Sequence, residues 1–301
     1  MIRIGLVRSN NAFLPENIAY KKYFESKVGY QVREFNTVED ADKNTDIIIF
    51  HCGFFPFWKK VESPLLMEYH SLSTTRYPKI KNILKRILNK KGSGYIFLSN
   101  VVRKGFFFSK KTNYRIRGMG YDETVIHKNL FREKQFDFIY MGTTSRSGVK
   151  ETIIKLASLG FTVAIVGNSR GEEEFYKGDL SDKVTCFGKM KQDEALSIAA
   201  TCRYGLNYTP DIYPLNIQDS TKVIEYCALG LNVVTNYYPW VKEFELKNGA
   251  NFLDLEALLN NPRIVENFAF CSGNISEYSW TNVLDSADIE GLIKKVLNDK
   301  K

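Results

Sequence analysis

The stretch YTPDIYPLNIQDSTKVIEYCALGLNVVTN, residues 208–236, indicates the fold most clearly. A polar loop leads to Ser220 and Thr221, which can begin a helix, and an apolar run of strand character follows that helix. Backbone N–H groups at the helix start, the two hydroxyls and the ammonium of Lys222 together make a binding site for a diphosphate. Glu225 follows one turn later, where its carboxylate can accept hydrogen bonds from a ribose diol. The alternative is an ordinary helix start followed by a solvated lysine and glutamate.

Outward from this stretch, apolar runs of strand length alternate with helical patterns along the chain. Strands are expected in the first half at residues 2–7, 30–35, 45–50, 65–69, 95–99 and 114–116, and in the second half at 136–142, 161–167, 184–188, 204–208 and 231–236. This alternation is typical of parallel, doubly wound α/β sheets. Because the pattern restarts after a charged connector, we predict two Rossmann-like domains, residues 1–130 and 131–301, with the ligand in a cleft between them.

The second half of the chain resembles the donor domain of GT-B glycosyltransferases, in particular the group 1 or family 4-like enzymes of bacterial surface polysaccharide synthesis. Their pattern Ser/Pro-x-Lys-x-x-Glu-Tyr-x-Ala-x-Gly-x-x-Val-Val is matched here by Ser220, Lys222, Glu225, Tyr226, Ala228, Gly230, Val233 and Val234. Neighbouring segments follow in the same order, so the resemblance covers residues 136–297. It implies the GT-B architecture, two Rossmann-like domains facing a cleft, with a last helix near residues 280–298 that crosses back to the N-terminal domain.

The resemblance also implies a set of donor-binding residues. In such families the glutamate at the position of Glu225 holds the donor ribose, and the lysine at that of Lys222 meets the diphosphate. Further donor-binding positions lie in the loops after successive strands: Gly142, Thr143, Thr144, Arg146, Gly167, Asn168, Phe187, Gly188, Lys189, Met190, Tyr208, Ser220 and Thr221. The sequence departs from the pattern of many retaining members, with Thr143 and Ser147 in place of an arginine and a lysine, and Ile217 in place of the first acid of a Glu-x7-Glu motif. Retaining and inverting stereochemistry therefore both remain open.

Two histidines in the first half are candidates for the catalytic residue. His70 follows PLLMEY and His51 follows DIIIF, so each lies at the carboxyl end of an expected strand. The resemblance favours His70, near the reacting sugar, with His51 as the alternative, and the near-neutral pKa of a histidine suits proton transfer. A hydrogen-bonded structural histidine is the other interpretation. The three histidines of the chain lack metal-ligand spacing, so we expect no metal and no cofactor beyond the donor.

Basic residues are concentrated in one tract. Residues 76–117 contain 13 lysines and arginines and no acid, in a chain of 301 residues with a net charge of +8. Within the tract, an expected helix near residues 79–89 carries an apolar stripe flanked by cations. The positive electrostatic field of these residues favours binding to anionic lipid or nucleic acid. We expect membrane or acceptor contacts from Lys79, Lys85, Arg86, Lys90, Lys91, Arg103 and Lys104. The alternative is that the stripe packs on the core while the lysines are solvated.

These patterns together predict a metal-independent glycosyltransferase that moves a sugar from a nucleoside-diphosphate sugar to a lipid-linked saccharide in bacterial surface polysaccharide synthesis. Without a signal-peptide or transmembrane pattern, we expect it in the cytoplasm, peripheral on the inner face of the cytoplasmic membrane, and with no nucleic-acid partner. One alternative is a GT-B-fold nucleotide-sugar-binding protein that acts as an epimerase or an inactive partner subunit. A more remote alternative is a nucleic-acid-binding protein that uses the basic surface.

Overall fold

The computed structural model describes residues 1–8, 15–51, 53–74, 76–130, 132–167 and 180–299. The chain divides into two compact units. Unit 1 comprises Met1–Met119 together with Trp280–Lys301, and unit 2 comprises Gly120–Ser279.

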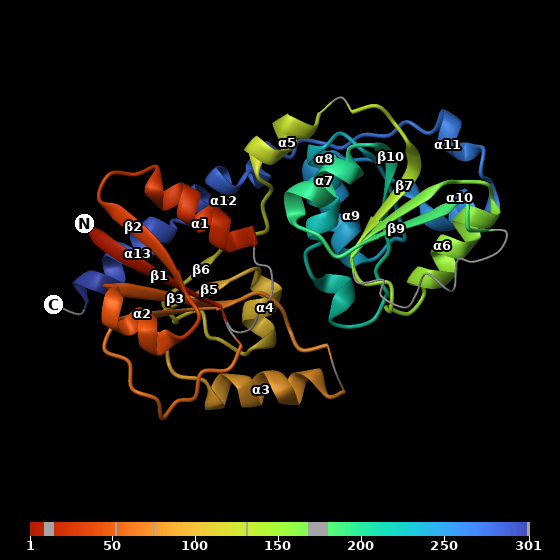
Figure 1. The fold of residues 1–301 in the computed structure, drawn as a ribbon. Coiled ribbons are helices and arrows are strands. Elements are labelled where there is room, and N and C mark those ends of the chain that lie inside the picture. The colour runs from red at the N-terminus through yellow and green to blue at the C-terminus, as the bar shows by residue number, and fades with distance from the viewer. Residues whose placement is uncertain (9–14, 52, 75, 131, 168–179, 300–301) are drawn as a thin grey trace. The chain divides into compact units, whose positions relative to one another are not determined.

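Unit 1 is built on a six-stranded parallel sheet in the order β2-β1-β3-β4-β5-β6 (Figure 1). Its strands are β1 (Ile2–Arg8), β2 (Tyr30–Phe35), β3 (Ile47–His51), β4 (Leu65–Tyr69), β5 (Gly94–Phe97) and β6 (Tyr114–Ile116). Its helices are α1 (Pro15–Glu25), α2 (Val38–Asn44), α3 (Pro78–Leu88), α4 (Asn100–Gly105), α12 (Trp280–Ser286) and α13 (Ile289–Asn298). Strands β3 and β4 are buried over their whole length, which explains why both segments are almost continuously apolar in sequence.

The C-terminal helices belong to unit 1 because several polar contacts tie them to its first helix and second strand. The Lys27 ammonium lies 2.7 Å from the Glu290 carboxylate, and the Tyr30 hydroxyl donates to the same carboxylate at 2.9 Å. The Tyr23 hydroxyl donates to Asp285. The structure thus places residues 280–299 with residues 1–119. This confirms the expectation that a last helix near residues 280–298 crosses back to the N-terminal domain, although the limit 131–301 had counted these residues with the second domain.

Unit 2 contains a second six-stranded parallel sheet, in the order β12-β11-β10-β7-β8-β9. Its strands are β7 (Phe136–Met141), β8 (Val163–Val166), β9 (Val184–Gly188), β10 (Cys202–Asn207), β11 (Asn232–Thr235) and β12 (Leu253–Asp254). Its described helices are α5 (Glu123–Asn129), α6 (Val149–Ser158), α7 (Gln192–Ala199), α8 (Thr221–Ala228), α9 (Pro239–Asn248), α10 (Leu255–Asn260) and α11 (Ile264–Asn267). The two parallel sheets confirm the predicted α/β class with two Rossmann-like domains.

The first boundary between the units lies at Met119–Gly120, earlier than the predicted limit at residue 130. Helix α5 belongs to unit 2 because it contacts α7, and the Tyr121 N–H donates to the Tyr278 carbonyl at 2.9 Å. The charged segment 127–135, which the sequence suggested as a connector, therefore begins within a helix that is already part of unit 2. Among the described residues, no helix combines the length and the hydropathy that a membrane span requires.

Candidate active site

Three predicted glycines bring the loops after neighbouring strands of unit 2 into close backbone contact. Gly142 follows β7 with φ 146° and Gly167 follows β8 with φ 145°, both in the region that favours glycine. A Cβ on Gly167 would lie 2.0 Å from the Gly142 carbonyl oxygen. The Gly167 N–H donates to the Gly188 carbonyl at 2.9 Å. These loops meet at the carboxyl ends of the strands, where ligands of such sheets bind.

Tyr208, another predicted donor-binding residue, lies against the start of helix α6. Gly148 precedes that helix with φ 84°, and a Cβ there would lie 1.9 Å from the Tyr208 hydroxyl. In the preceding loop, Thr144 is buried and Arg146 is exposed. Asn168 lies outside the described residues, so its predicted role stays a prediction.

At the start of helix α8, the Ser220 hydroxyl does not cap the helix. It donates instead to the Asn207 side-chain oxygen at 3.1 Å. The Asn207 amide in turn donates to the Thr235 hydroxyl at 2.9 Å and the Tyr238 hydroxyl at 3.1 Å. Ser220 therefore anchors the helix start to buried ends of β10 and β11, and its side chain leaves the N–H groups of the first turn to other partners.

Lys222, in the first turn of α8, has a mostly buried side chain with its ammonium 4.7 Å from the centroid of the Tyr140 ring. Burial, together with the positive charge of Arg146, lowers the pKa of Lys222 to about 7. Among the described residues, no carboxylate lies within ion-pair distance of either cation. A bound anion would supply the missing negative charge at this helix N-terminus.

Glu225 is buried one turn further along α8 and accepts a hydrogen bond from the side-chain amide of Gln192. Gln192 is the first residue of α7. The predicted residues Phe187 and Gly188 end strand β9, and Lys189 and Met190 lie between that strand and α7. The sequence-based set omitted Gln192, because nothing in its local pattern indicates that α7 begins beside α8. Phe187 and Lys189 are exposed, and Gly188 has φ 72°.

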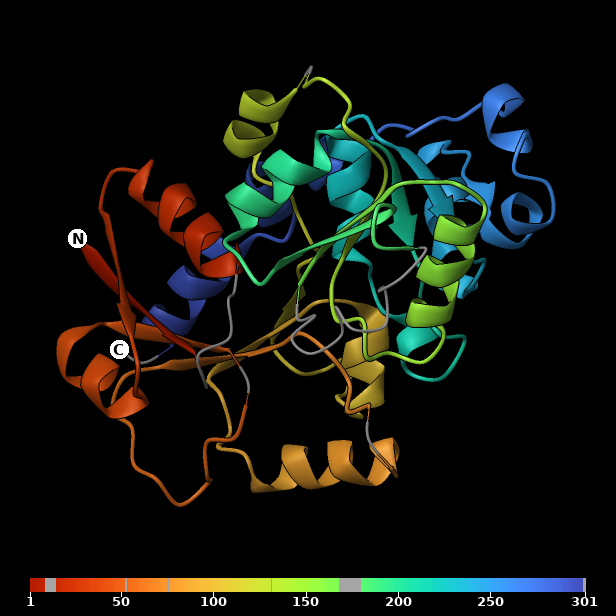
Figure 2. The ribbon, with the colours of Figure 1, turned by 45° about the vertical axis from the view of Figure 1, so that its right-hand side comes forward.

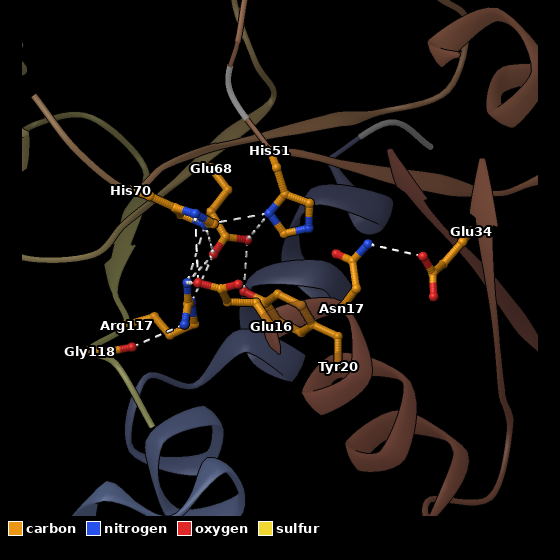
Figure 3. A network of polar contacts seen from close by, with 9 residues as sticks. All are labelled: Glu16, Asn17, Tyr20, Glu34, His51, Glu68, His70, Arg117 and Gly118. Carbon is orange, nitrogen blue, oxygen red and sulfur yellow. Dashed lines mark hydrogen bonds and ion pairs between the residues drawn. The ribbon is translucent and has the colours of Figure 1, made fainter. Parts of the chain in front are cut away.

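A buried network in unit 1 joins both candidate histidines to one carboxylate (Figure 3). Glu68 lies in β4 with its side chain fully buried, 2.9 Å from Nε2 of His70 and 3.5 Å from Nδ1 of His51. The guanidinium of Arg117, which follows β6, lies 2.6 Å from the same carboxylate, and the Tyr20 hydroxyl donates to it at 3.0 Å. The sequence offered His51 and His70 as alternatives, and the structure brings them together at the carboxyl ends of β3 and β4.

The electrostatics of this network follow from burial and from the central ion pair. Burial lowers the pKa of His51 to about 4, so the ring is neutral near pH 7. Burial alone would raise the pKa of Glu68, but the positive charge of Arg117 holds it well below its usual range. Glu68 and Arg117 therefore form a charged buried pair beside a neutral His51.

Three buried polar atoms around the network have no hydrogen-bond partner among the described residues: Glu16 Oε2, Asn17 Oδ1 and His51 Nε2. They come from α1 and the end of β3 (Figure 3). His70 is the more accessible of the two histidines, with 21% of its side chain exposed against 3% for His51. A ligand that carries hydroxyl groups would match the donors and acceptors gathered here.

Among the described residues, His51, Glu68 and His70 form a group whose ligand atoms are close enough for a metal ion. The Arg117 guanidinium already donates to Glu68 and lies 3.3 Å from His70 Nε2, so a divalent ion would meet a cation at this position. The sequence also contains Asp40 and Asp42 at Asp-x-Asp spacing, but both lie in helix α2, where Asp42 accepts the Ser63 N–H at 2.7 Å. Neither group fits a catalytic divalent metal.

The prediction that Arg103 contacts a membrane or an acceptor is wrong. Arg103 is buried, donates to the Phe108 carbonyl at 2.7 Å and lies 5.0 Å from the Tyr114 ring centroid. Its guanidinium donates to a carbonyl in the segment after α4 and packs on the Tyr114 ring, so it serves the core of unit 1. The exposed or partly exposed members of the set are Lys79, Lys85, Arg86, Lys90, Lys91 and Lys104.

The structure is similar to solved structures of a glycosyltransferase, of a protein in complex with UDP-glucose and of an epimerase. With AviGT4, a glycosyltransferase involved in avilamycin A biosynthesis, the TM-score is 0.66 at 11% identity over 99% of each chain. With HepE of Anabaena in complex with UDP-glucose, it is 0.61 at 13% identity over 99% of each chain. With the UDP-N-acetylglucosamine 2-epimerase of Rickettsia bellii, it is 0.57 at 10% identity over 99% of this chain and 96% of that one.

No family model matches the chain, and no curated protein matches it. Similarity at 13% identity or below concerns the fold, and the neighbours extend over both units. The chain therefore has the fold of the GT-B glycosyltransferases, as the sequence predicts.

Proposed function

We propose that this protein is a glycosyltransferase that uses a nucleoside-diphosphate sugar as donor. The observation that carries the proposal is the start of α8, where Lys222 and Arg146 lie near a helix N-terminus that the Ser220 side chain does not cap. Two basic side chains and the N–H groups of a first helical turn suit a diphosphate, whose charge would restore the proton to Lys222.

Glu225 and Gln192 support the nucleoside part of this assignment. The buried Glu225 carboxylate accepts from the Gln192 amide, and a carboxylate at this position suits the two hydroxyls of a ribose, which donate hydrogen bonds. The exposed ring of Phe187, near the end of β9, offers a face on which a base can stack. The identity of the base and the sugar remains to be determined by experiment.

His70 is the residue that we assign to the reacting sugar, with His51 as its support. His70 has the more exposed side chain, and its Nε2 faces Glu68 and Arg117, which hold the ring in place. The neutral, buried His51 is less suited to exchange a proton with a ligand. We assign no stereochemistry, since a histidine beside an ion pair is compatible with either outcome.

Charge neutralisation of the leaving nucleoside diphosphate would come from the protein itself. The helix N-terminus, Lys222 and Arg146 provide positive potential where the diphosphate charge develops, which is the role a divalent metal has in other transferases. We therefore propose a reaction that needs no metal ion.

The acceptor that we propose is a saccharide linked to a lipid, used in surface polysaccharide synthesis at the inner face of the cytoplasmic membrane. The support is the basic tract of residues 76–117, most of whose cations are exposed and which contains no acid. Each basic residue near an anionic leaflet contributes roughly 1 kcal/mol to binding. A peripheral position at the membrane would bring a lipid-linked acceptor within reach.

The experiment that tests the donor assignment is a thermal-shift panel of UDP, GDP, dTDP and CMP, each with and without magnesium. UDP is the first candidate because the structure of HepE, one of the similar proteins, contains UDP-glucose. We expect one nucleoside diphosphate to raise the Tm equally with and without magnesium, and Lys222→Ala to abolish the rise. No rise with any nucleotide in the wild type would refute the donor site.

An epimerase is the second candidate function, because the fold is also that of a UDP-N-acetylglucosamine 2-epimerase. Incubation with the preferred nucleotide sugar alone distinguishes the two. Conversion into an isomeric nucleotide sugar without acceptor would favour the epimerase, and release of the nucleoside diphosphate only with an acceptor would favour the transferase. Binding without either reaction would indicate an inactive partner subunit.

A further inference from the structure

Helix α3 of unit 1 exposes its apolar side chains to solvent. Ile80, Leu84 and Ile87 are 56%, 49% and 64% exposed, and Asn82 is the buried residue of the helix. An amphipathic helix of a globular protein ordinarily buries this stripe. In Figure 1 and Figure 2 the helix runs along the edge of unit 1, away from its sheet. The apolar stripe is therefore available to a partner, contrary to the alternative in which it packs on the core.

Two exposed aromatic side chains extend this apolar surface. Phe57 and Trp58 are 55% and 63% exposed, and their ring centroids lie 5.0 Å apart. Backbone hydrogen bonds attach their loop to the end of α3: the Phe57 N–H donates to the Leu88 carbonyl at 2.9 Å and the Lys90 N–H donates to the Phe55 carbonyl at 2.8 Å. Because of these bonds, the loop and the helix present one surface.

Phe107 adds a third aromatic ring at an unusual backbone position. It is 49% exposed and has φ 60°, in the left-handed region. The Phe107 N–H donates to the Lys104 carbonyl and the Phe108 N–H to the Arg103 carbonyl, which is the arrangement that ends a helix with a left-handed residue. Glycine is the usual residue there, so an exposed phenylalanine costs stability without burying its ring. Such a cost suggests that the ring has a function.

A groove of about 650 Å³ runs between these elements. Its apolar wall consists of Phe57, Ile83, Ile87 and Phe107. Its polar wall contains three cations, Arg86, Lys90 and Lys91. Arg86 donates to the Phe107 carbonyl and Lys90 to the Lys59 carbonyl at 2.6 Å, so both ammonium and guanidinium groups are held at the groove.

We propose that α3, residues 53–60 and Phe107, together called the α3 surface, dock on an anionic membrane, and that the groove takes the hydrocarbon chain of a lipid whose phosphate binds the three cations. Apolar and aromatic side chains surrounded by lysines and arginines match the boundary between acyl chains and anionic headgroups. The absence of acids in residues 76–117 favours such a headgroup over a protein surface of mixed charge. The proposal rests on the lipid-linked acceptor of the proposed function and identifies where its lipid part binds.

The membrane part of this proposal is tested by sedimentation with vesicles of phosphatidylglycerol and phosphatidylcholine in equal parts, against phosphatidylcholine alone. The variant Ile87→Glu puts a charge on the α3 surface, and Leu246→Glu is its matched control, because Leu246 is 87% exposed in α9 of unit 2. We expect the wild type and Leu246→Glu to bind the anionic vesicles, and Ile87→Glu to bind them about tenfold more weakly. Equal binding of all three, or no binding of the wild type, would overturn the proposal.

The variant Phe107→Gly separates a binding role of this ring from a structural one. Glycine relieves the left-handed backbone, so the Tm should rise while binding to the anionic vesicles falls. A fall in Tm would show that the ring supports the fold, and unchanged vesicle binding would remove Phe107 from the α3 surface. Association of the wild type into dimers that Ile87→Glu disrupts, without vesicle binding, would assign the surface to a second copy and overturn the proposal.

The groove is tested with farnesyl phosphate, compared with farnesol and with inorganic phosphate. We expect farnesyl phosphate to bind at least tenfold more tightly than either fragment, and Lys91→Ala to weaken it. If inorganic phosphate binds as tightly as farnesyl phosphate, the groove binds only the phosphate group, and the proposal that it holds a hydrocarbon chain is overturned. Stabilisation by UDP is measured on the same proteins: Ile87→Glu should keep it, so a failure of the α3 surface and a failure of the donor site give different results.

Discussion

His51 and His70, which are 19 positions apart in sequence, meet at the carboxyl end of the unit 1 sheet with Nδ1 of one ring 3.4 Å from Nε2 of the other. Both rings also face the carboxylate of Glu68, which Arg117 already neutralises. Protonating both rings would place two like charges at hydrogen-bond distance. The pair therefore couples proton binding at the candidate site to the stability of unit 1.

The first prediction concerns the pH dependence of that stability. The pKa of His51 falls from 6.5 to about 4 on folding, so the unfolded chain binds more protons between these values. Stability should fall as the pH is lowered from about 6.5 to about 4, by up to about 3 kcal/mol. Pulse proteolysis in urea at pH 7 and pH 5, read from fragments of unit 1, measures the loss.

The variant His51→Gln should lose less stability than the wild type over the same interval, because it has no imidazole to protonate. His127→Gln is the control, since His127 is exposed in α5 of unit 2. If His51→Gln keeps the full pH dependence of the wild type, another group is responsible and the assignment to His51 is wrong.

The second prediction concerns the buried ion pair. Arg117→Met leaves the fully buried Glu68 carboxylate without its main counter-charge, and the free energy of unfolding of unit 1 should fall by about 3–5 kcal/mol. Arg115→Met is the matched control, because the Arg115–Asp288 pair is 29% and 60% exposed. It should cost below about 1 kcal/mol. If urea unfolding shows that Arg117→Met loses no more unfolding free energy than Arg115→Met, the Arg117–Glu68 pair contributes little to stability.

The third prediction concerns proton uptake by Lys222. With its pKa lowered to about 7, a large part of the lysine is neutral above pH 7, and a bound diphosphate should restore the proton. UDP affinity should fall by up to about tenfold per pH unit above pH 7. Isothermal titration in buffers of different ionisation enthalpy should detect uptake of a proton in the wild type and none in Lys222→Arg, whose charge is permanent. Uptake that persists in Lys222→Arg would assign the proton to another group.

The fourth prediction compares two glycines with positive φ in the donor loops. A Cβ at Gly167 would lie 2.0 Å from the Gly142 carbonyl oxygen, whereas a Cβ at Gly188 would meet no atom within 4 Å. Gly188→Ala should cost about 1 kcal/mol of unfolding free energy from backbone strain alone. Gly167→Ala should cost more and should also weaken UDP binding, because two backbone segments must move apart. Equal Tm values for the two variants would contradict the close approach.

Much of the fold could be predicted because the relevant signals are local. The apolar runs of β3 and β4, the helix that begins at Thr221 and the order of elements from 136 to 297 depend on the spacing of neighbouring residues. The position of residues 280–301 in unit 1 could not be derived in this way. It depends on contacts such as Lys27–Glu290, between groups 263 positions apart.

The candidate site shows the same division. The sequence by itself determined the residue types at the strand ends and at the start of α8, including His51, His70 and Lys222, since chain direction in a parallel sheet fixes which end carries the loops. Tertiary structure alone decided that the two histidines share Glu68, that Arg103 and Arg117 are buried within a basic tract, and that the α3 stripe is exposed. The reason is physical: charge and periodicity are properties of neighbours along the chain, whereas burial and ion pairing depend on which distant segments pack together.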